Sequence, residues 1–175
     1  MSKPESEPSF VPASCSELLR LEGGEEVRLS AVERLLLVCD GTVTHMLEAL
    51  TREPVDVIVL DQDCEAGVLD RRVRLETTTG RPLLWARSTI DLDKLDESVG
   101  EWLLQEEFGI GNALRKADVE TRRSLHGVTI QEPDKASFPE FVPDSAGTLL
   151  ARTYRVYESE VPIMTIREYM PFGRL

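Results

Sequence analysis

The sequence has few of the residues that metal sites and nucleophilic sites usually require. Its cysteines are Cys15, Cys39 and Cys64, and its histidines are His45 and His126. The cysteines form no CxxC pair and the histidines lie far apart, so neither a metal-ligand spacing nor a Ser-His nucleophile is indicated. We therefore expect no metal ion. Cys39 continues the apolar row of an expected helix, which favours a place in the core.

Positive charge and long apolar runs are also scarce. The chain has 32 acidic and 20 basic residues and a formal net charge of -12, which argues against binding to DNA, RNA or anionic membrane surfaces. No apolar run approaches the ~20 residues of a membrane span, and no signal peptide is indicated. We expect a cytoplasmic protein without a nucleic-acid or membrane partner. A small anionic ligand is compatible with this composition if local positive charge and backbone N–H groups bind it.

The length of 175 residues predicts one domain that can bury a substantial core. Residues 1–13 contain three prolines and three serines, a composition typical of a mobile tail. Residues 131–147 contain three further prolines and predict a surface loop. We expect a tail at 1–13 and a single domain at 14–175 with a loop insertion at about 131–147.

Two helices are expected near the start of the domain. Ser30-Ala31-Val32-Glu33 has the pattern of a capping box, in which two side chains satisfy free backbone N–H groups at a helix start. This helix would end at Asp40-Gly41, and Thr42 or a neighbour would cap the next helix. The expected buried stripes are Val32, Leu35, Leu36 and Cys39 in the first helix and Val43, Met46, Leu47 and Leu50 in the second.

The rest of the chain reads mainly as strands. Apolar alternation predicts a largely buried strand at 55–62 and another strand at 119–125, the latter with an arginine, Arg123, of ambiguous orientation. Residues 71–77 and 83–90 flank a turn with glycine and proline and predict a hairpin. The spacing in 91–108 predicts a helix, and a final hairpin is expected at 149–171. This order predicts an α+β fold with an antiparallel sheet and helices packed on one face.

Two charged side chains lie in apolar rows of these expected hairpins. Successive side chains of a strand point to opposite faces. Glu168 therefore shares a face with Ile166, and Arg71 shares a face with Val73 while Arg72 faces the other way. Burying either charge alone would cost several kcal/mol, so a fold that keeps both should pair them or use them on a ligand.

Three interpretations of these charges stay open from the pattern. Arg71 and Glu168 could form a structural salt bridge with each other. Inward-facing charges on strands also protect sheet edges against aggregation. In the third interpretation the two charges bind a small ligand that fits between them, because perturbed charges cluster at functional sites.

Two backbone breaks could contribute to such a ligand site. A helix that starts within Asp40-Gly41-Thr42-Val43-Thr44 would point free backbone N–H groups at whatever lies before it, and helix N-termini bind carboxylates and phosphates. A capping function alone is the simpler interpretation. Gly109-Ile110-Gly111 is a tight connection in which two glycines let the backbone approach another group. It is too short for a dinucleotide-binding loop.

Four segments together resemble the chorismate lyases, in the same chain order. They are Asp40-Gly41-Thr42-Val43-Thr44, Arg71-Arg72-Val73-Arg74-Leu75 with Ala86-Arg87-Ser88 on its partner, Gly109-Ile110-Gly111, and Pro162-Ile163-Met164-Thr165-Ile166-Arg167-Glu168-Tyr169. The sequence is most similar to the divergent bacterial and archaeal branch of that family, over about residues 30–171. Chorismate lyases remove pyruvate from chorismate to leave 4-hydroxybenzoate. The resemblance implies this activity without a metal or an organic cofactor, in a monomer or a homodimer.

The resemblance also implies roles for individual positions. It makes Arg71 the side chain that pairs with the ring carboxylate of the substrate. Val43 and Ile110, with Gly111 beside it, become the residues whose backbone N–H groups bind the same carboxylate. Glu168 becomes the carboxyl group at the opposite end, beside the ring hydroxyl, so that Glu168 and Arg71 are the implied catalytic residues.

Two departures from the family pattern keep alternatives open. Gly109 stands where the family usually has proline, and the loop at 131–147 is long. A related enzyme of the same fold could therefore act on another small aromatic or cyclic carboxylic acid. The other alternative is a non-catalytic small-molecule-binding domain, like the effector-sensing domains of some bacterial transcription regulators, because one fold hosts different functions.

Overall fold

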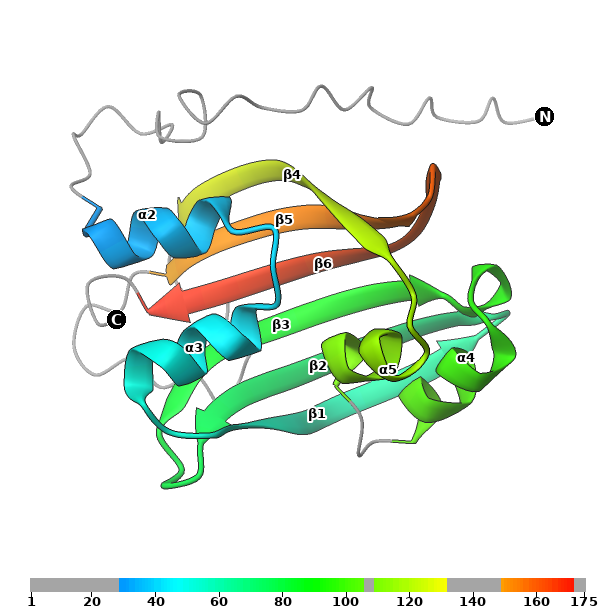
Figure 1. The fold of residues 1–175 in the computed structure, drawn as a ribbon, viewed down its shortest axis with the longest axis horizontal. Coiled ribbons are helices and arrows are strands. Elements are labelled where there is room, and N and C mark those ends of the chain that lie inside the picture. The colour runs from blue at the N-terminus through cyan, green and yellow to red at the C-terminus, as the bar shows by residue number, and fades with distance from the viewer. Residues whose placement is uncertain (1–28, 106–108, 132–148, 172–175) are drawn as a thin grey trace.

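The computed structural model describes residues 29–105, 109–131 and 149–171 (Figure 1). The expected tail at 1–13 lies outside the described residues, and so does the expected loop at 131–147 apart from Gln131. Within these ranges no helix is both long enough and apolar enough to cross a membrane.

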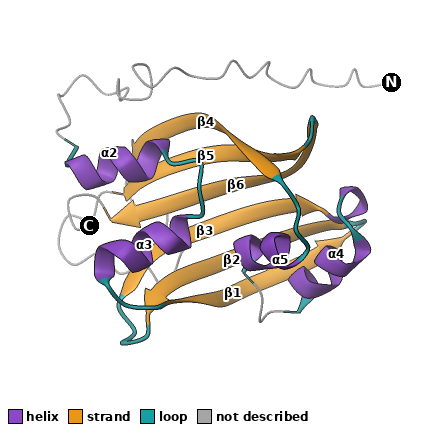
Figure 2. Ribbon diagram, in the orientation of Figure 1, coloured by secondary structure: helices purple, strands orange, loops and turns teal. Residues whose placement is uncertain are grey.

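Six strands form one antiparallel sheet in the order β1-β2-β3-β6-β5-β4. Their bounds are β1 Val55–Glu65, β2 Val68–Thr77, β3 Pro82–Asp91, β4 Thr121–Gln131, β5 Leu149–Glu158 and β6 Val161–Pro171. The helices of the described ranges pack on one face of this sheet (Figure 2). The expected α+β fold, an antiparallel sheet with helices on one face, is therefore confirmed.

The alternation predicted for the two hairpins is present. On β2 every second side chain is buried, so that Arg71 is 1% exposed while Arg72 and Arg74 are only half-buried. On β6, Glu168 is 2% exposed. Both charges therefore face the helix-covered side of the sheet, among apolar neighbours.

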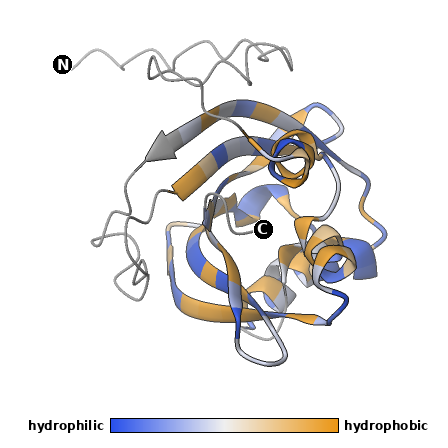
Figure 3. Ribbon diagram, turned by 90° about the vertical axis from the view of Figure 1, so that its left-hand side faces the viewer, coloured by the Kyte–Doolittle hydropathy of each residue, from blue (hydrophilic) through white to orange (hydrophobic). Residues whose placement is uncertain are grey.

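The sheet curves around the helices, and apolar and polar residues alternate along its strands (Figure 3). The main core lies between the sheet and the helices. A smaller apolar cluster on the opposite face consists of Trp85, Leu149, Ala151 and Tyr169, with Leu60 packed against it. Alternate residues of the same strand therefore belong to different apolar clusters, one on each face of the sheet.

Helix α2 spans Ala31–Val38 and begins with the expected capping box. The backbone N of Ser30 donates to Glu33 Oε2 at 2.7 Å, and the backbone N of Glu33 donates to Ser30 Oγ at 3.2 Å. The expected stripe is right at Leu36 and misses the buried Leu37. It is wrong at Leu35, which is 62% exposed, and at Cys39, which is the C-cap and only half-buried instead of part of the core. Glu33 itself is buried, and the residues three and four positions after it share its face of the helix.

Helix α3 spans Val43–Thr51 and has Thr42 as its N-cap, although the Thr42 side chain makes no capping hydrogen bond. Leu47 is fully buried, whereas Leu50 is 40% exposed, contrary to the expected stripe. Strand β1 is also less buried than expected. It is an edge strand with a neighbour on one side only, and most of its side chains are half-buried or exposed.

The helix expected over 91–108 is interrupted. A short 3-10 turn, η1 Leu92–Lys94, precedes helix α4 Glu97–Leu104. Asp96 separates them because its carboxylate accepts the backbone N–H of Ser98 at 2.9 Å and so caps a new helix. Helix α5, Ile110–Lys116, was not expected; it begins directly after Gly109, its N-cap.

The order of elements repeats within the chain. The order α2-α3-β1-β2-β3 is followed by α4-α5-β4-β5-β6, with the short turn η1 between them. The two sets of three strands meet at the β3·β6 pair in the middle of the sheet. The structure thus consists of two similar halves, each with two helices followed in the chain by three strands, although no sequence repeat marks them.

The different exposure of two neighbouring leucines on α2 gives a first prediction. Leu36→Ala should lower the free energy of unfolding by about 2–5 kcal/mol, because it removes a buried side chain and leaves a cavity. Leu35→Ala is the matched control and should cost less than ~1 kcal/mol. Chemical denaturation of the two variants checks this. Equal losses would mean that α2 buries the other face.

Candidate active site

A cavity lies between the sheet and the helices. Its volume, counted as space open to the centre of a water-sized sphere, is about 80 Å³, well above the ~10–15 Å³ that one water needs. Its lining includes all the site residues expected from the sequence, namely Val43, Arg71, Ile110, Gly111 and Glu168. These residues come from α3, β2, α5 and β6, so the fold brings together positions that are far apart in the sequence.

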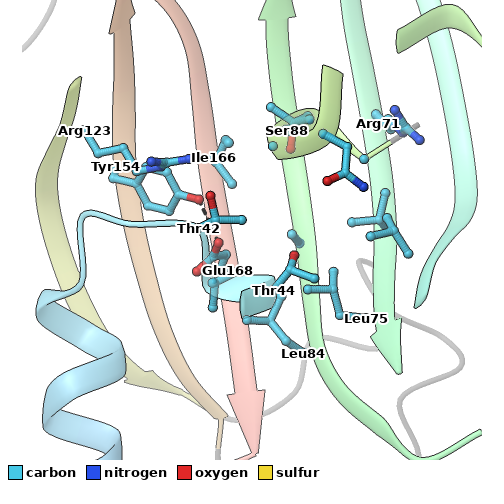
Figure 4. A pocket seen from close by; sticks show the side chains of 18 residues that line it. Thr42, Thr44, Arg71, Leu75, Leu84, Ser88, Arg123, Tyr154, Ile166 and Glu168 are labelled. Carbon is cyan, nitrogen blue, oxygen red and sulfur yellow. Dashed lines mark hydrogen bonds between the residues drawn. The ribbon is translucent and has the colours of Figure 1, made fainter. Parts of the chain in front are cut away.

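Arg71 forms one end of the cavity (Figure 4). Its neighbour on β3 is Ser88, which also lines the cavity. Arg71 Nη1 donates to the carbonyl oxygen of Leu103, in the last turn of α4, at 3.4 Å. Carbonyl groups in the last turn of a helix have no partner inside the helix, so this bond ties α4 to the sheet. A guanidinium has five N–H donors and can bind a ligand carboxylate as well.

Two helices begin at the cavity. Helix α3 starts at Val43 and helix α5 starts at Ile110, and both residues line the cavity. A Cβ atom at Gly111 would lie 3.1 Å from Thr42 Cγ2. Glycine at this position therefore lets the start of α5 pack closely against the residue that precedes α3.

Gly109 fits its position because the space beside it is narrow, and its backbone conformation does not call for glycine. Its φ angle is -72°, which any residue can adopt. A Cβ atom at this position would, however, lie 3.2 Å from Val57 Cγ2 on β1. The departure from the family's usual proline thus occurs where the helix start lies against a strand side chain.

Glu168 forms the opposite end of the cavity, and each of its two carboxylate oxygens accepts a hydrogen bond. Its Oε2 accepts a hydrogen bond from Arg152 Nε at 2.6 Å, and its Oε1 accepts one from Tyr154 OH at 2.7 Å. Arg152 is 1% exposed. The proposed salt bridge between Arg71 and Glu168 is therefore wrong in its partner. The carboxylate pairs with an arginine on β5, the strand beside its own.

Arg152 also joins the sheet to helix α2. Its Nη1 donates to the carbonyl oxygens of Leu36 and of Cys39, the latter at 3.1 Å. Burial lowers the pKa of Arg152, but the charge and hydrogen bond of Glu168 and the proximity of Tyr154 raise it by more, so the net shift is upward. The guanidinium remains charged and holds the carboxylate and the end of the helix together.

Tyr154 remains a neutral hydrogen-bond donor in this network. Burial, and then the negative charge of Glu168, raise the pKa of the Tyr154 hydroxyl well above its usual value. The phenol therefore keeps its proton and donates a hydrogen bond to the carboxylate of Glu168. Its ring also lies under the guanidinium of Arg152, with 5.2 Å between Cζ and the ring centre.

Arg123 on β4 is a further cation at the cavity. It lies beside Tyr154, on the side of Glu168 and across from Arg71 (Figure 4). Its Nη1 donates to the carbonyl oxygen of Asp40, in the connection between α2 and α3, at 2.8 Å. Arg123 therefore contacts both the cavity and the connection that precedes α3.

Arg152 and Tyr154 were not predicted as site residues from the sequence, and Arg123 was not assigned to a site. The signal for Arg152 was present, since it alternates with Leu150 and Val156 on β5 and all three are buried. The same argument that singled out Glu168 would have found it. No comparable signal marks Arg123, because its strand is at the edge of the sheet.

Comparisons with solved structures identify the same fold elsewhere. PhnF from Mycobacterium smegmatis superposes with a TM-score of 0.60 at 12% identity, over 79% of this chain and 67% of that chain. The effector domain of the same protein superposes with a TM-score of 0.55 at 13% identity, over 77% of this chain and 90% of that domain. At these identities the likeness concerns the fold alone.

Comparisons of sequence identify the family. The "Putative lyase MJ0807" of Methanocaldococcus jannaschii is 30% identical over 141 residues, which cover 78% of this chain and 76% of the relative. A family model described as "Chorismate pyruvate-lyase Rv2949c-like" matches residues 37–174. That range includes both ends of the cavity and the starts of α3 and α5. The chain belongs to the Rv2949c-like chorismate pyruvate-lyase family.

Proposed function

We propose that this protein is a lyase that eliminates pyruvate from chorismate and releases 4-hydroxybenzoate. The observation that carries the proposal is the cavity, which has Arg71 at one end and Glu168 at the other, in a chain of this family. The ring of chorismate has a carboxylate at C1 and a hydroxyl at C4. The cavity offers a cation to the first group and a carboxylate to the second.

Arg71 binds the ring carboxylate in this proposal. A hydrogen bond between charged groups contributes about 1.5–3 kcal/mol, more than a bond between neutral groups. Val43 and Ile110 add backbone N–H groups from the starts of α3 and α5, where the helix dipole also favours negative charge. The closeness of Gly111 to Thr42 keeps the two helix starts near each other.

Glu168 removes the proton from C4 at the other end of the ring. The bond between C3 and the ether oxygen breaks, and its electron pair leaves with the enolpyruvyl group. That group takes up a proton on its methylene carbon and becomes pyruvate, while the ring becomes aromatic. The step needs no oxidant or reductant, and the proton taken from C4 balances the proton added to the methylene carbon.

The pairing of Glu168 is compatible with this role. A carboxylate has about four lone-pair positions, and the bonds from Arg152 and Tyr154 occupy two of them. The others can accept from the ring hydroxyl and take up a proton. Because aromatisation drives the elimination, the enzyme has mainly to hold the ring in position and to transfer one proton.

The second candidate is a binding domain without turnover. The fold likeness to the effector domain of PhnF favours it, because the same fold supports ligand binding in other functional contexts. A related elimination on another cyclic acid is the third candidate. The three candidates differ in what they do with chorismate. The lyase converts it to 4-hydroxybenzoate, the binding domain binds it unchanged, and the related enzyme does not react with it because its substrate is another cyclic acid.

Incubation with chorismate tests the proposal directly. Pyruvate is followed by coupled reduction with NADH, and the aromatic product is separated by chromatography. The proposal expects equal amounts of pyruvate and 4-hydroxybenzoate. Formation of 3-hydroxybenzoate would indicate a different elimination. Binding of 4-hydroxybenzoate without any turnover of chorismate would favour the binding domain.

The face of β2 gives a second prediction. Arg71→Ala should lower chorismate turnover and 4-hydroxybenzoate affinity by about ten- to a hundredfold, because it removes the charged partner of the ring carboxylate. Arg72→Ala and Arg74→Ala are matched controls, since these side chains pair with Asp61 and Glu76 on the other face. Equal losses at Arg71 and Arg74 would contradict the assigned role.

A third prediction concerns the reacting end. Glu168→Gln keeps the shape of the side chain but removes proton transfer, so turnover should fall on the order of a hundredfold or more. The affinity for 4-hydroxybenzoate should change much less. Turnover and calorimetric affinity are measured on the same sample, with the melting temperature as a control for folding. Normal turnover in a folded Glu168→Gln protein would rule out Glu168 as the base.

A fourth prediction separates the structural part of Glu168 from its chemical part. Arg152→Met leaves the Glu168 charge buried without its cation and should lower the free energy of unfolding by about 3–5 kcal/mol. The double variant Arg152→Met/Glu168→Gln buries no charge at this position and should recover part of the loss. Chemical denaturation measures both. Strictly additive losses would mean that the two residues are not coupled.

A further inference from the structure

The cavity has a second arginine in its lining besides Arg71. Among the described residues that line it, Arg71, Arg123 and Glu168 are the charged ones. Arg152, on the neighbouring strand, pairs with Glu168. In the proposed function Arg71 binds the ring carboxylate, so Arg123 is the arginine of the lining that can bind a second acidic group.

Arg123 is the cation that the ring carboxylate does not use. Its Nη1 is bonded to the carbonyl oxygen of Asp40, but its Nε is buried and has no hydrogen-bond partner among the described residues. A buried donor without a partner carries a penalty that a bound acceptor removes. The side chain lies at the Glu168 end of the cavity, beside Tyr154 and away from Arg71 (Figure 4).

Space for a further group exists next to Arg123. A second cavity, of about 200 Å³ by the same measure, shares Thr42, Gly111 and Arg123 with the first. Its other charged lining residues are Arg115, Asp118 and Glu120, all exposed to solvent. Solvent screens these outer charges, so the half-buried Arg123 dominates at the junction of the two cavities.

We infer that Arg123 binds the second carboxylate of a dicarboxylate substrate, the one carried on the three-carbon ether substituent. The inference rests on the proposed function and deepens it. With the ring carboxylate at Arg71 and the ring hydroxyl at Glu168, a substituent at C3 leaves the ring next to the Glu168 end. That is the end at which Arg123 and the second cavity lie. Arg123 thus distinguishes the dianionic substrate from the monoanionic aromatic product.

Two stable aromatic acids test this assignment without any reaction. 3-(Carboxymethoxy)-4-hydroxybenzoate carries both carboxylates in the required positions, and 3-ethoxy-4-hydroxybenzoate has a similar shape without the second one. The wild-type protein should bind the dicarboxylate more tightly, as measured by calorimetry. Arg123→Gln should weaken the dicarboxylate about ten- to a hundredfold and change the monocarboxylate by less than ~threefold.

Two further variants complete the experiment. Arg122→Gln, on the opposite face of the same strand and 55% exposed, should leave both affinities unchanged. Arg123→Lys keeps the charge and should weaken the dicarboxylate only severalfold, which also serves if Arg123→Gln does not fold. In kinetic assays Arg123→Gln should raise KM for chorismate while leaving inhibition by 4-hydroxybenzoate unchanged.

The outcomes separate this inference from the proposed function. Equal weakening of both acids by Arg123→Gln, with chorismate turnover in the wild-type protein, would overturn the role of Arg123 alone. A wild-type protein that turns over chorismate but shows no preference for the dicarboxylate would do the same. A wild-type protein that binds neither acid and leaves chorismate unchanged would overturn both.

Discussion

A carboxylate buried beside a cavity has to be paired, and the pairing of Glu168 shapes much of the surrounding structure. Arg152 and Tyr154 donate hydrogen bonds to its two oxygens, and Arg152 also donates to the carbonyl oxygens of Leu36 and Cys39 at the end of α2. An eight-residue helix is too short to be stable by itself. The same guanidinium therefore compensates the buried charge and fixes the helix whose end leads into the start of α3.

Each half of the sheet has a buried arginine that donates to a carbonyl oxygen at the end of a helix, but the two arginines have different neighbours in the sheet. Arg71 on β2 bonds to the carbonyl of Leu103 at the end of α4, as Arg152 on β5 bonds to the end of α2. In the sheet Arg71 stands beside Ser88, whereas Arg152 stands beside Glu168. The sheet neighbour of Arg71 is the neutral Ser88, whereas the carboxylate of Glu168 compensates the charge of Arg152. The repeated architecture thus produces a cavity with two chemically different ends.

The sequence predicted those features that depend on local pattern. Alternation was sufficient to place Arg71 and Glu168 on the covered face, and the capping box located the start of α2. Arg152, the partner of Glu168, was missed although it follows the same alternation and the expected final hairpin pairs its strand with that of Glu168. Leu35 was wrongly predicted to be buried, because the buried face of a short helix depends on what packs against it. The helix that starts at Ile110 was not predicted, because the close approach of Gly109 to Val57 arises only in the folded chain.

The net charge of the chain is negative while two arginines line the cavity, and distance decides which of these charges a ligand experiences. The formal net charge of the chain is -12, and salt screens charges at a protein surface beyond about 8 Å. At the cavity Arg71 and Arg123 act at short range and in a lower dielectric, where each interaction is stronger. The acidic composition therefore argues against nucleic acids, which contact the surface, and does not oppose a small dianion that reaches the interior.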